Sequence, residues 1–388
     1  MPISHTLFER LKVLFDLLAF TFTFAISALL CAIAILRPSL LMRQDHMISD
    51  LTARQAQHTR PTPRVGGVAI VVAVFTGGLL FADRFELDLV LALLSGAVVF
   101  LVGLREDIMR NVSPRMRLLA AFISASLAIM LSGAQLPGLG IEAVDVVFQW
   151  AIVAIAITLL WSAGTCHALN LIDGLNGLAS LYCVCAAGAI CIIAGYTEDT
   201  DIQIVSGLLI AAVLGFFVFN WPLGRIFMGD ASAYGIGHIL AWLGLILIAR
   251  NPEISGFAIL LVLFWPVCET LFSMIRRRLN KCATDQPDRL HFHHLVVRAL
   301  PLIFNRGKRR IYDNSLATIV ILPFLVSPIL IGLLFWDHAV QAAIGLVFFI
   351  ALFIVTYVIS MNYFVSLRFR KSNSAASQSH GRRGWDAA

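Results

Sequence analysis

Charged residues are scarce in this chain. Asp, Glu, Lys and Arg make up 13% of its 388 residues, against roughly 25% in an average soluble protein. Hydrophobic residues make up 59%, and the mean hydropathy is +0.86. So few charges cannot give a folded chain a hydrated surface, which excludes an ordinary soluble domain. The composition indicates a protein that crosses a membrane many times.

The sequence has no CxxC pair, no clear signal-peptide cleavage site and no visible internal repeat. The seven cysteines are odd in number, lie mostly in apolar runs and form no CxxC pair, so we interpret them as small apolar fillers. The first apolar run follows Arg10 and Lys12 and has no clear small-residue cleavage site, so it is interpreted as a retained span. No internal repeat of the kind found in many transporters is visible.

Apolar runs recur along the whole chain. A bilayer core takes about 20 residues to cross, so we predict an all-α integral membrane protein with about 11 transmembrane helices. The runs at 65–82, with four glycines, and at 118–136 are the weakest, which leaves ten spans as the alternative. Residues 1–366 would form the membrane domain, and residues 367–388 a polar, disordered cytoplasmic tail. The runs lie near 14–36, 65–82, 88–104, 118–136, 143–163, 178–195, 203–221, 231–249, 256–275, 316–336 and 339–361.

Basic residues are divided unevenly between the two predicted sides. The polar segments after odd-numbered runs hold 25 of the 29 lysines and arginines. Because cytoplasmic loops carry the excess of such residues, these segments are predicted to face the cytoplasm. The net charge of +6 therefore reflects topology and gives no case for a nucleic-acid partner. All motifs below fall on this side, whereas a transporter needs access from both.

Acidic residues stand at the ends of apolar runs. Asp230 begins a run in Met228-Gly229-Asp230, and Mg²⁺ is commonly held by one or two carboxylates with water and substrate phosphates. The alternative is a helix N-cap, where Asp is favoured. Glu106 and Asp107 are adjacent, and a carboxylate pair suits a general base. Solvated loop acids are the alternative for this pair.

The segment from Asn170 to Ala179 carries two glycines three residues apart. Glycine lets backbone amides approach an anion or a ring closely. Asn170, Asp173 and Asn176 are of the types that ligate a metal or read a nucleotide base. A plain turn between two spans would use the same residue types.

Three histidines, His291, His293 and His294, follow Asp288 and Arg289. Histidine and arginine together can bind a diphosphate, arginine through bidentate contacts. Zinc is the rival ligand, since clustered histidines attract transition metals. No cysteine or second histidine group stands at zinc-finger spacing, however, and the adjacent arginine would repel a dication.

In this order the motifs resemble those of the polyprenyl-phosphate N-acetylhexosamine-1-phosphate transferases, membrane enzymes of the glycosyltransferase family 4 type that start bacterial cell-envelope polymers. The resemblance covers residues 40–300 approximately. It rests on Pro61-Thr62-Pro63-Arg64-Val65-Gly66-Gly67, the acid pair at 106–107, Asn170 through Ala179, Met228-Gly229-Asp230, and Asp288-Arg289 with His291-x-His293-His294.

The resemblance implies transfer of a sugar 1-phosphate from a UDP-N-acetylhexosamine to undecaprenyl phosphate, with release of UMP. The site would face the cytoplasm in a bacterial inner membrane and use Mg²⁺, or Mn²⁺. A homodimer is compatible with it. The implied catalytic residues are Glu106, Asp107, Asp173 and Asp230, the last three also as metal ligands. The implied substrate-binding residues are Arg64, Asn170, Asn176, Arg289, His291, His293 and His294.

The donor sugar stays open, with UDP-GlcNAc favoured. His-x-His-His looks like the branch that uses simple UDP-N-acetylhexosamines for O-antigen, enterobacterial common antigen or teichoic acid. The peptidoglycan branch typically carries three consecutive histidines, so UDP-MurNAc-pentapeptide is the alternative donor. Glu106 and Asn176 stand where many members have Asp. These departures motivate one rival hypothesis, that the protein is a non-catalytic scaffold. A second rival, from another functional class, is a transporter of nucleotide sugars or metal ions.

Overall fold

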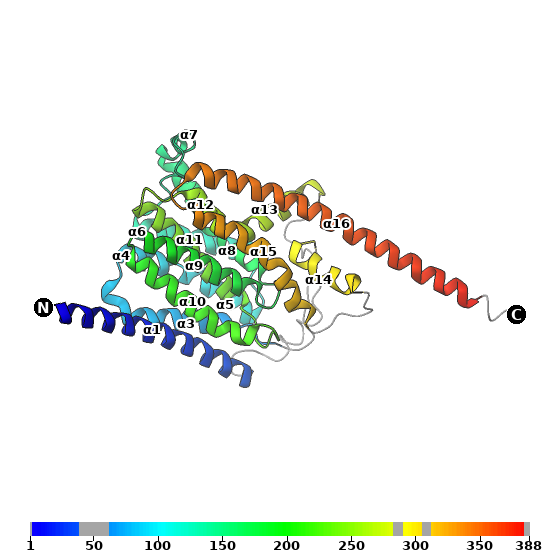
Figure 1. Cartoon of the computed structure of the whole chain (residues 1–388), viewed down its shortest axis with the longest axis horizontal. Coiled ribbons are helices and arrows are strands. Elements are labelled where there is room, and N and C mark those ends of the chain that lie inside the picture. The colour runs from blue at the N-terminus through cyan, green and yellow to red at the C-terminus, as the bar shows by residue number, and fades with distance from the viewer. Residues whose placement is uncertain (1, 39–61, 282–289, 305–311, 384–388) are drawn as a thin grey trace.

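The computed structural model describes residues 2–38, 62–281, 290–304 and 312–383, and within them the chain is helical and free of β-strands (Figure 1). The elements are α1 (Pro2–Leu36), α3 (Gly66–Gly78), η2 (Leu79–Arg84), α4 (Leu87–Ser95), α5 (Ala97–Met109), α6 (Pro114–Ser132), α7 (Glu142–Asp145), η3 (Val146–Gln149), α8 (Ala151–Ile172), α9 (Leu178–Tyr196), α10 (Thr200–Asn220), α11 (Gly229–Arg250), α12 (Gly256–Val262), α13 (Phe264–Leu279), α14 (Phe292–Ile303), α15 (Asp313–Leu334) and α16 (Ala339–Arg383).

The helices pack side by side as an elongated bundle. In the described ranges, ten helical stretches are long and apolar enough to cross a membrane, with η2 extending α3 and with α4 and α5 joined as one stretch. The ninth predicted run is instead a bent pair, because α12 and α13 meet at Leu263 with an angle of 80°. Counting that pair as one span gives eleven. The all-α multi-pass membrane fold is therefore confirmed.

One predicted run is misplaced. The sequence suggests a span at 143–163, but α8 begins at Ala151 and ends at Ile172. The apolar residues before it form α7 and η3, where Val146 and Val147 are exposed. The stretch 164–177, expected to be a polar loop, is consequently helical for most of its length.

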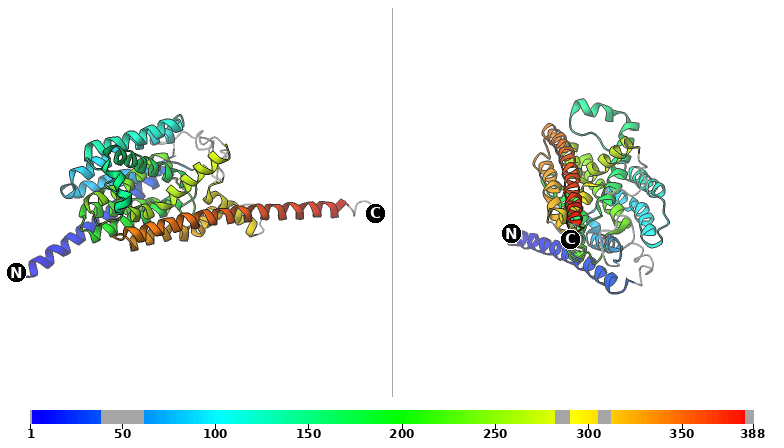
Figure 2. Two further views of the ribbon diagram at one scale, coloured as in Figure 1. Left: turned by 90° about the horizontal axis from the view of Figure 1, so that it is seen from above. Right: turned by 90° about the vertical axis from the view of Figure 1, so that its right-hand side faces the viewer.

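The last helix is longer than a membrane span. α16 continues to Arg383 and projects well beyond the bundle (Figure 2). It therefore enters residues 367–383, for which the sequence predicts a disordered tail. The division into a membrane domain and a cytoplasmic tail stays a prediction.

α11 is the central helix. Of its most apolar stretch, 94% is buried, against 22% for α16, and it packs against α3, α5, α8 and α9. Its 22 residues make it about 33 Å long. It therefore connects the two ends of the bundle, with Asp230 at one end and Arg250 at the other.

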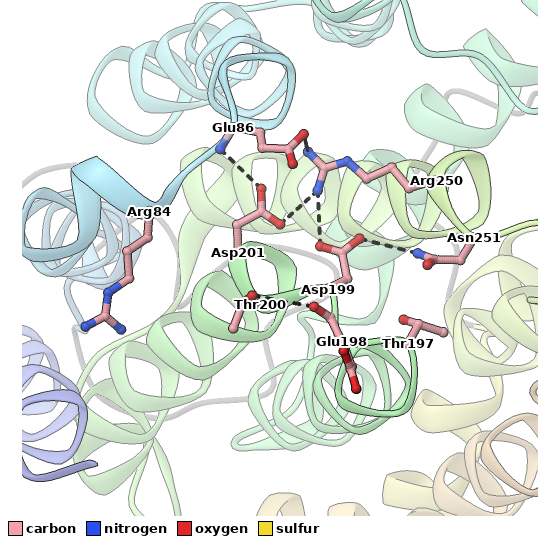
Figure 3. A pocket seen from close by; sticks show the side chains of 9 residues that line it. All are labelled: Arg84, Glu86, Thr197, Glu198, Asp199, Thr200, Asp201, Arg250 and Asn251. Carbon is pink, nitrogen blue, oxygen red and sulfur yellow. Dashed lines mark hydrogen bonds and ion pairs between the residues drawn. The ribbon is translucent and has the colours of Figure 1, made fainter. Parts of the chain in front are cut away.

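The far end of α11 is fixed by ion pairs (Figure 3). Arg250 contacts carboxylates of two other helices and their adjoining loops at 2.8–3.2 Å. These acids are Glu86, Asp88, Asp199 and Asp201. One guanidinium thus joins the starts of α4 and α10 to the end of α11, beside a polar pocket.

Candidate active site

The motifs that are far apart in the sequence meet around the start of α11. The first motif lies along the residues that precede this helix. Phe227 N donates to the carbonyl of Pro63 at 2.9 Å, and Gly66 N donates to the carbonyl of Phe227 at 3.0 Å. Gly67 N donates to the carbonyl of Met228 at 2.9 Å. This pairing places Arg64 beside the first turn of α11.

The first turn of α11 is capped by an acid from another helix. Asp107 on α5 is 5% exposed, and its two carboxylate oxygens accept hydrogen bonds from the backbone N–H groups of Asp230 (2.9 Å) and Ala231 (2.8 Å). The first N–H groups of a helix have no partner within the helix. Gly229 has a φ of +82°, and a Cβ there would lie 2.8 Å from Asp107 Oδ2. Both carboxylate oxygens of Asp107 therefore cap the first turn of α11.

Asp230 is the centre of the site. Its carboxylate accepts a hydrogen bond from Asn170 Nδ2 at 3.0 Å and pairs with Arg117 Nη1 of α6. The hydroxyl of Tyr234, one turn later on α11, donates to Asn170 Oδ1 at 3.4 Å. Asp230 is 8% exposed. A buried carboxylate in such a position requires these donors to offset the loss of hydration.

Asp173 lies at the end of α8 on the other side of the same turn. Its Oδ2 accepts a hydrogen bond from Gly229 N at 3.3 Å. Removal from water raises the pKa of Asp173 to about 7, although the charge of Arg64 and the Gly229 hydrogen bond act in the opposite direction. The charge of Asp230 adds to the rise. Such a carboxyl group exchanges its proton near neutral pH, which is typical of functional sites.

Two predicted site residues have local structural contacts. Glu106 Oε2 accepts a hydrogen bond from Val112 N at 2.8 Å, which closes the loop after α5. Asn176 is 7% exposed; its backbone N–H donates to Asn314 Oδ1 at 2.7 Å and its Nδ2 donates to the carbonyl of Pro222 at 3.1 Å. The structure therefore uses Asn176 to join three segments of chain. A substrate contact for either residue stays a prediction.

The histidine segment packs against the Asp173 turn. His293 is fully buried, and a Cβ at Gly174 would lie 3.1 Å from its Nε2. Its Nδ1 hydrogen bonds to Glu269 Oε1 of α13 at 2.9 Å, and His291 Nδ1 lies 3.7 Å from the same oxygen. The rings of His293 and His294 are 4.3 Å apart. The three histidines thus form one cluster around a buried carboxylate.

The start of α11 brings together Arg64, Asp107, Asn170, Asp173 and Asp230. Glu106, Asn176 and the histidines have the separate contacts described above. Arg289 lies outside the described residues, together with Asp288 and Pro61 of the motifs. Among the residues that are described, no group of three or more His, Cys, Asp and Glu side chains is arranged to hold a metal ion.

Comparison with known proteins points to one family. Residues 89–248, from α4 to α11, match the model of glycosyl transferase family 4. Over this stretch the chain is similar to that family. The matched stretch contains the acid pair, the Asn170 segment and the Asp230 turn.

Curated relatives agree with this similarity. A probable undecaprenyl-phosphate N-acetylglucosaminyl 1-phosphate transferase of Bacillus subtilis (strain 168) is 28% identical over 249 residues, covering 64% of this chain and 69% of the relative. A decaprenyl-phosphate N-acetylglucosaminephosphotransferase of Mycobacterium tuberculosis (H37Rv) is 29% identical over 274 residues, covering 62% and 67%. A phospho-N-acetylmuramoyl-pentapeptide-transferase of Streptococcus suis (05ZYH33) is 28% identical over 204 residues, covering 50% and 61%, less than two thirds of that relative.

The fit of this site to Mg²⁺ depends on which carboxylate oxygens are already occupied. Both oxygens of Asp107 are occupied by backbone N–H groups. Asp173 accepts a hydrogen bond from Gly229 N through Oδ2, and the charge of Asp230 acts on it. Two carboxylates suffice for Mg²⁺, which keeps waters and substrate phosphates in its shell. Both oxygens of Asp230 also accept hydrogen bonds, from Asn170 and Arg117, so an ion held by Asp230 and Asp173 would have to displace one of these donors.

Sequence reasoning missed three site residues. Glu269 is an acid inside a predicted span, and that alone marks a functional position. Arg117 pairs with Asp230 from the first turns of α6, and its sequence signal was a basic residue at the predicted cytoplasmic end of a span. His167 lies on α8 next to Tyr234, with ring centroids 5.0 Å apart. It fell in a segment interpreted as a loop, so its helical spacing from Asn170 was not used.

Proposed function

We propose that this protein transfers an N-acetylhexosamine 1-phosphate from a UDP-N-acetylhexosamine, UDP-GlcNAc being favoured, to undecaprenyl phosphate, and releases UMP. The observation that carries the proposal is the meeting of Asp173 and Asp230 with Arg64 and Arg117 at one helix start, in a membrane protein similar to glycosyl transferase family 4. Acids and arginines together suit a metal-bound diphosphate. The relatives that are named as polyprenyl-phosphate transferases support the same reaction class.

The basic residues would bind and orient the phosphates. Arg117 can offer a bidentate contact to phosphate oxygens, and Arg64 adds positive charge beside Asp173. The histidine cluster lies against Gly174 and would contact the donor diphosphate from the other side. A bound Mg²⁺ would supply neutralisation of the charge on the transferring group.

Asp173 must be ionised to hold Mg²⁺. Its pKa is about 7 without the metal, so binding of the ion would release a proton near neutral pH. A deprotonated oxygen of the acceptor phosphate would attack the β-phosphorus of the donor, in line with the leaving UMP. Asp107 is poorly placed to hold the ion because both of its oxygens hold the start of α11.

The site would face the cytoplasm of a bacterial inner membrane, where UDP-sugars are made. The distribution of 25 of 29 basic residues on that side supports this orientation.

The test is a substrate panel. Membranes that contain the protein would be incubated with undecaprenyl phosphate, Mg²⁺ and one UDP-sugar at a time, and UMP and the lipid-linked sugar would be measured. We expect both products with UDP-GlcNAc or a related UDP-N-acetylhexosamine. Asp230→Asn should reduce the rate at least 100-fold, about 3 kcal/mol of transition-state stabilisation. Asp337→Asn, an exposed acid beyond α15, is the matched control and should keep the native rate.

Other outcomes decide between the rivals. UMP release only with UDP-MurNAc-pentapeptide would assign the peptidoglycan reaction. Uptake of a UDP-sugar or metal ion into vesicles that lack acceptor lipid would indicate a transporter. No UMP with any donor, from protein that is folded in detergent, would indicate a non-catalytic scaffold.

A further inference from the structure

His167 lies one helical turn before Asn170 on the face of α8 that meets α11. Residues three apart on a helix are neighbours on one face, and Asn170 donates to Asp230. His167 therefore belongs to the shell of side chains around that carboxylate. The charges of Asp230 and Arg117 both act on its ring.

His167 carries a polar atom that nothing satisfies. Its Nε2 is shielded from water and makes no hydrogen bond to any residue that the structure describes. Arg117 Nε, next to the same carboxylate, is in the same condition. An unmade hydrogen bond at a buried polar atom is costly, so such atoms occur where a ligand completes them. His167 Nε2 and Arg117 Nε, both near the Asp230 carboxylate, therefore indicate a site where a ligand atom that accepts hydrogen bonds would bind.

His238 is a buried histidine with a structural role, and its hydrogen bonds can be compared with those of His167. His238 on α11 is fully buried, and its Nε2 contacts the carbonyl of Ala92 at 2.9 Å and Ser95 Oγ at 3.2 Å. Although its Nδ1 lacks a partner, the ring is fixed between helices. His167 is only half-buried and meets Tyr234 edge-on, at an interplanar angle of 68°. Its ring contacts Tyr234 and the backbone of Arg117, and its Nε2 makes no hydrogen bond to the described residues.

We propose that His167 is a substrate-contacting residue whose Nε2–H donates a hydrogen bond to a phosphoryl oxygen held beside Asp230, with Arg117 Nε as the second donor. The oxygen belongs to a phosphate monoester or diphosphate. A hydrogen-bond donor fits this position better than a magnesium ligand, because Mg²⁺ takes oxygen ligands. Which substrate supplies the phosphate rests on the proposed function, but the binding of the phosphate group does not.

The test uses inorganic pyrophosphate with Mg²⁺ as the probe, with the purified full-length protein in detergent and isothermal titration calorimetry. His167→Phe keeps a flat ring without a donor, and we expect about tenfold weaker binding, the loss of one hydrogen bond to a charged group. His167→Gln places an amide N–H near the position of Nε2 and should stay within about threefold of the native affinity. His238→Gln is the matched control and should bind as the native protein does.

Each outcome bears on the proposal. Native affinity in His167→Phe, or no binding of pyrophosphate by the native protein, overturns it. If His167→Phe does not fold, His167→Asn replaces it, because the amide of Asn reaches the position of Nδ1 and not that of Nε2. Weak pyrophosphate binding by His167→Asn together with near-native binding by His167→Gln supports the proposal. The reverse order of affinities overturns it. In the transfer assay the KM of a phosphorylated substrate should rise more than kcat falls.

The two proposals fail separately. If the native protein releases no UMP with any donor while pyrophosphate binding depends on His167, the proposed reaction is wrong and the phosphate contact stands. If UMP is released and His167→Phe binds pyrophosphate normally, only the contact is wrong.

Discussion

Asp107 holds the backbone of Asp230. The two acids were both predicted as metal ligands, but in the structure one carboxylate caps the helix that presents the other. Asp107 thus acts on the site through the position of α11.

Replacement of Asp107 should therefore reduce stability as well as activity. In Asp107→Asn an amide NH₂ replaces one oxygen and faces a backbone N–H, which should cost about 1–3 kcal/mol. Thermal unfolding in detergent would measure the loss. Glu106→Gln is the neighbouring control, because its remaining oxygen still accepts from Val112 N, and it should stay within about 0.5 kcal/mol of the native protein. A native melting temperature for Asp107→Asn would contradict the capping role.

Asp173 should give both stability and activity a dependence on pH. Its pKa is about 7 in the folded protein and 3.8 as the reference value. The folded state therefore binds the proton more tightly, so the Asp173 contribution to stability is present at low pH and is lost as pH rises through this window. Activity should rise through pH 7, as the carboxylate forms. In Asp173→Asn the unfolding free energy should lose this slope, and the remaining activity should lose the rise. An unchanged pH profile of both quantities would exclude the role.

Glu269 should act on the donor through the histidines. Glu269→Leu removes the partner of His293 Nδ1 and should raise the KM for the UDP-sugar tenfold or more, from the loss of about 1.5–3 kcal/mol. The KM for undecaprenyl phosphate should change much less. Glu269→Gln keeps an oxygen acceptor and should have an intermediate effect. Thr270→Val removes only a hydroxyl bonded to Pro266 and serves as control. Equal changes in both KM values would argue against a donor-specific role.

Arg250 should be required for stability at the far end of the bundle. Arg250→Met leaves four carboxylates without their shared cation, which should cost about 1–3 kcal/mol for partly exposed pairs. The loss should be smaller at pH 5 than at pH 8, because withdrawal from water and the bond to Asp201 raise the pKa of Asp199 to about 7, so that protonation relieves the repulsion. Arg84→Met, which loses one ion pair with Asp16 and the contacts of its guanidinium with the rings of Phe15 and Phe81, should have a smaller effect. Equal unfolding free energies for the two variants would refute this assignment.

The orientation in the membrane can be tested directly. A reporter fused after Lys371 should be cytoplasmic, and one inserted at Glu198 should be external, because the basic residues gather on the side of the predicted site. Enzymatic reporters that are active on one side only would measure this. A cytoplasmic signal at Glu198 would contradict the proposed orientation of the Asp230 end.

The sequence located the spans but not all of their ends. Apolar runs predict membrane helices well because lipid admits few alternatives. α8 was misjudged because its polar residues were assumed to face water. In fact Thr165 bonds to the carbonyl of Trp161 at 2.7 Å, and Ser162 accepts from Trp242 Nε1 at 3.0 Å. Hydropathy cannot distinguish a polar side chain satisfied inside the bundle from one in a loop.

The bend between α12 and α13 also escaped prediction. Pro266 stands in the third position of α13, where proline is tolerated because the first N–H groups of a helix are unbonded. A proline inside the run 256–275 therefore indicated a helix start. The run as a whole was apolar enough to hide it.

The site was predicted as a set of motifs, and their order in the sequence pointed to the family whose model residues 89–248 match. The task of each acid was not predictable, because it depends on which backbone N–H groups lie opposite. Asp107 is buried and Asp173 is partly buried, both near Gly229, yet Asp107 accepts from two backbone N–H groups and Asp173 from one. A role for Glu269 could be assigned only from the structure, in which its Oε1 lies 2.9 Å from His293 Nδ1.

α11 is fastened at both ends by carboxylates that belong to its neighbours. Asp107 accepts hydrogen bonds from the first N–H groups of α11. Asp88 of α4 and Asp201 of α10 form ion pairs with Arg250 in the last turn of α11. The helix can neither slide along its axis nor rotate without breaking bonds at both ends of the bundle. We therefore expect α11 and Asp230 to keep their position while any movement that admits a substrate is made by the surrounding helices.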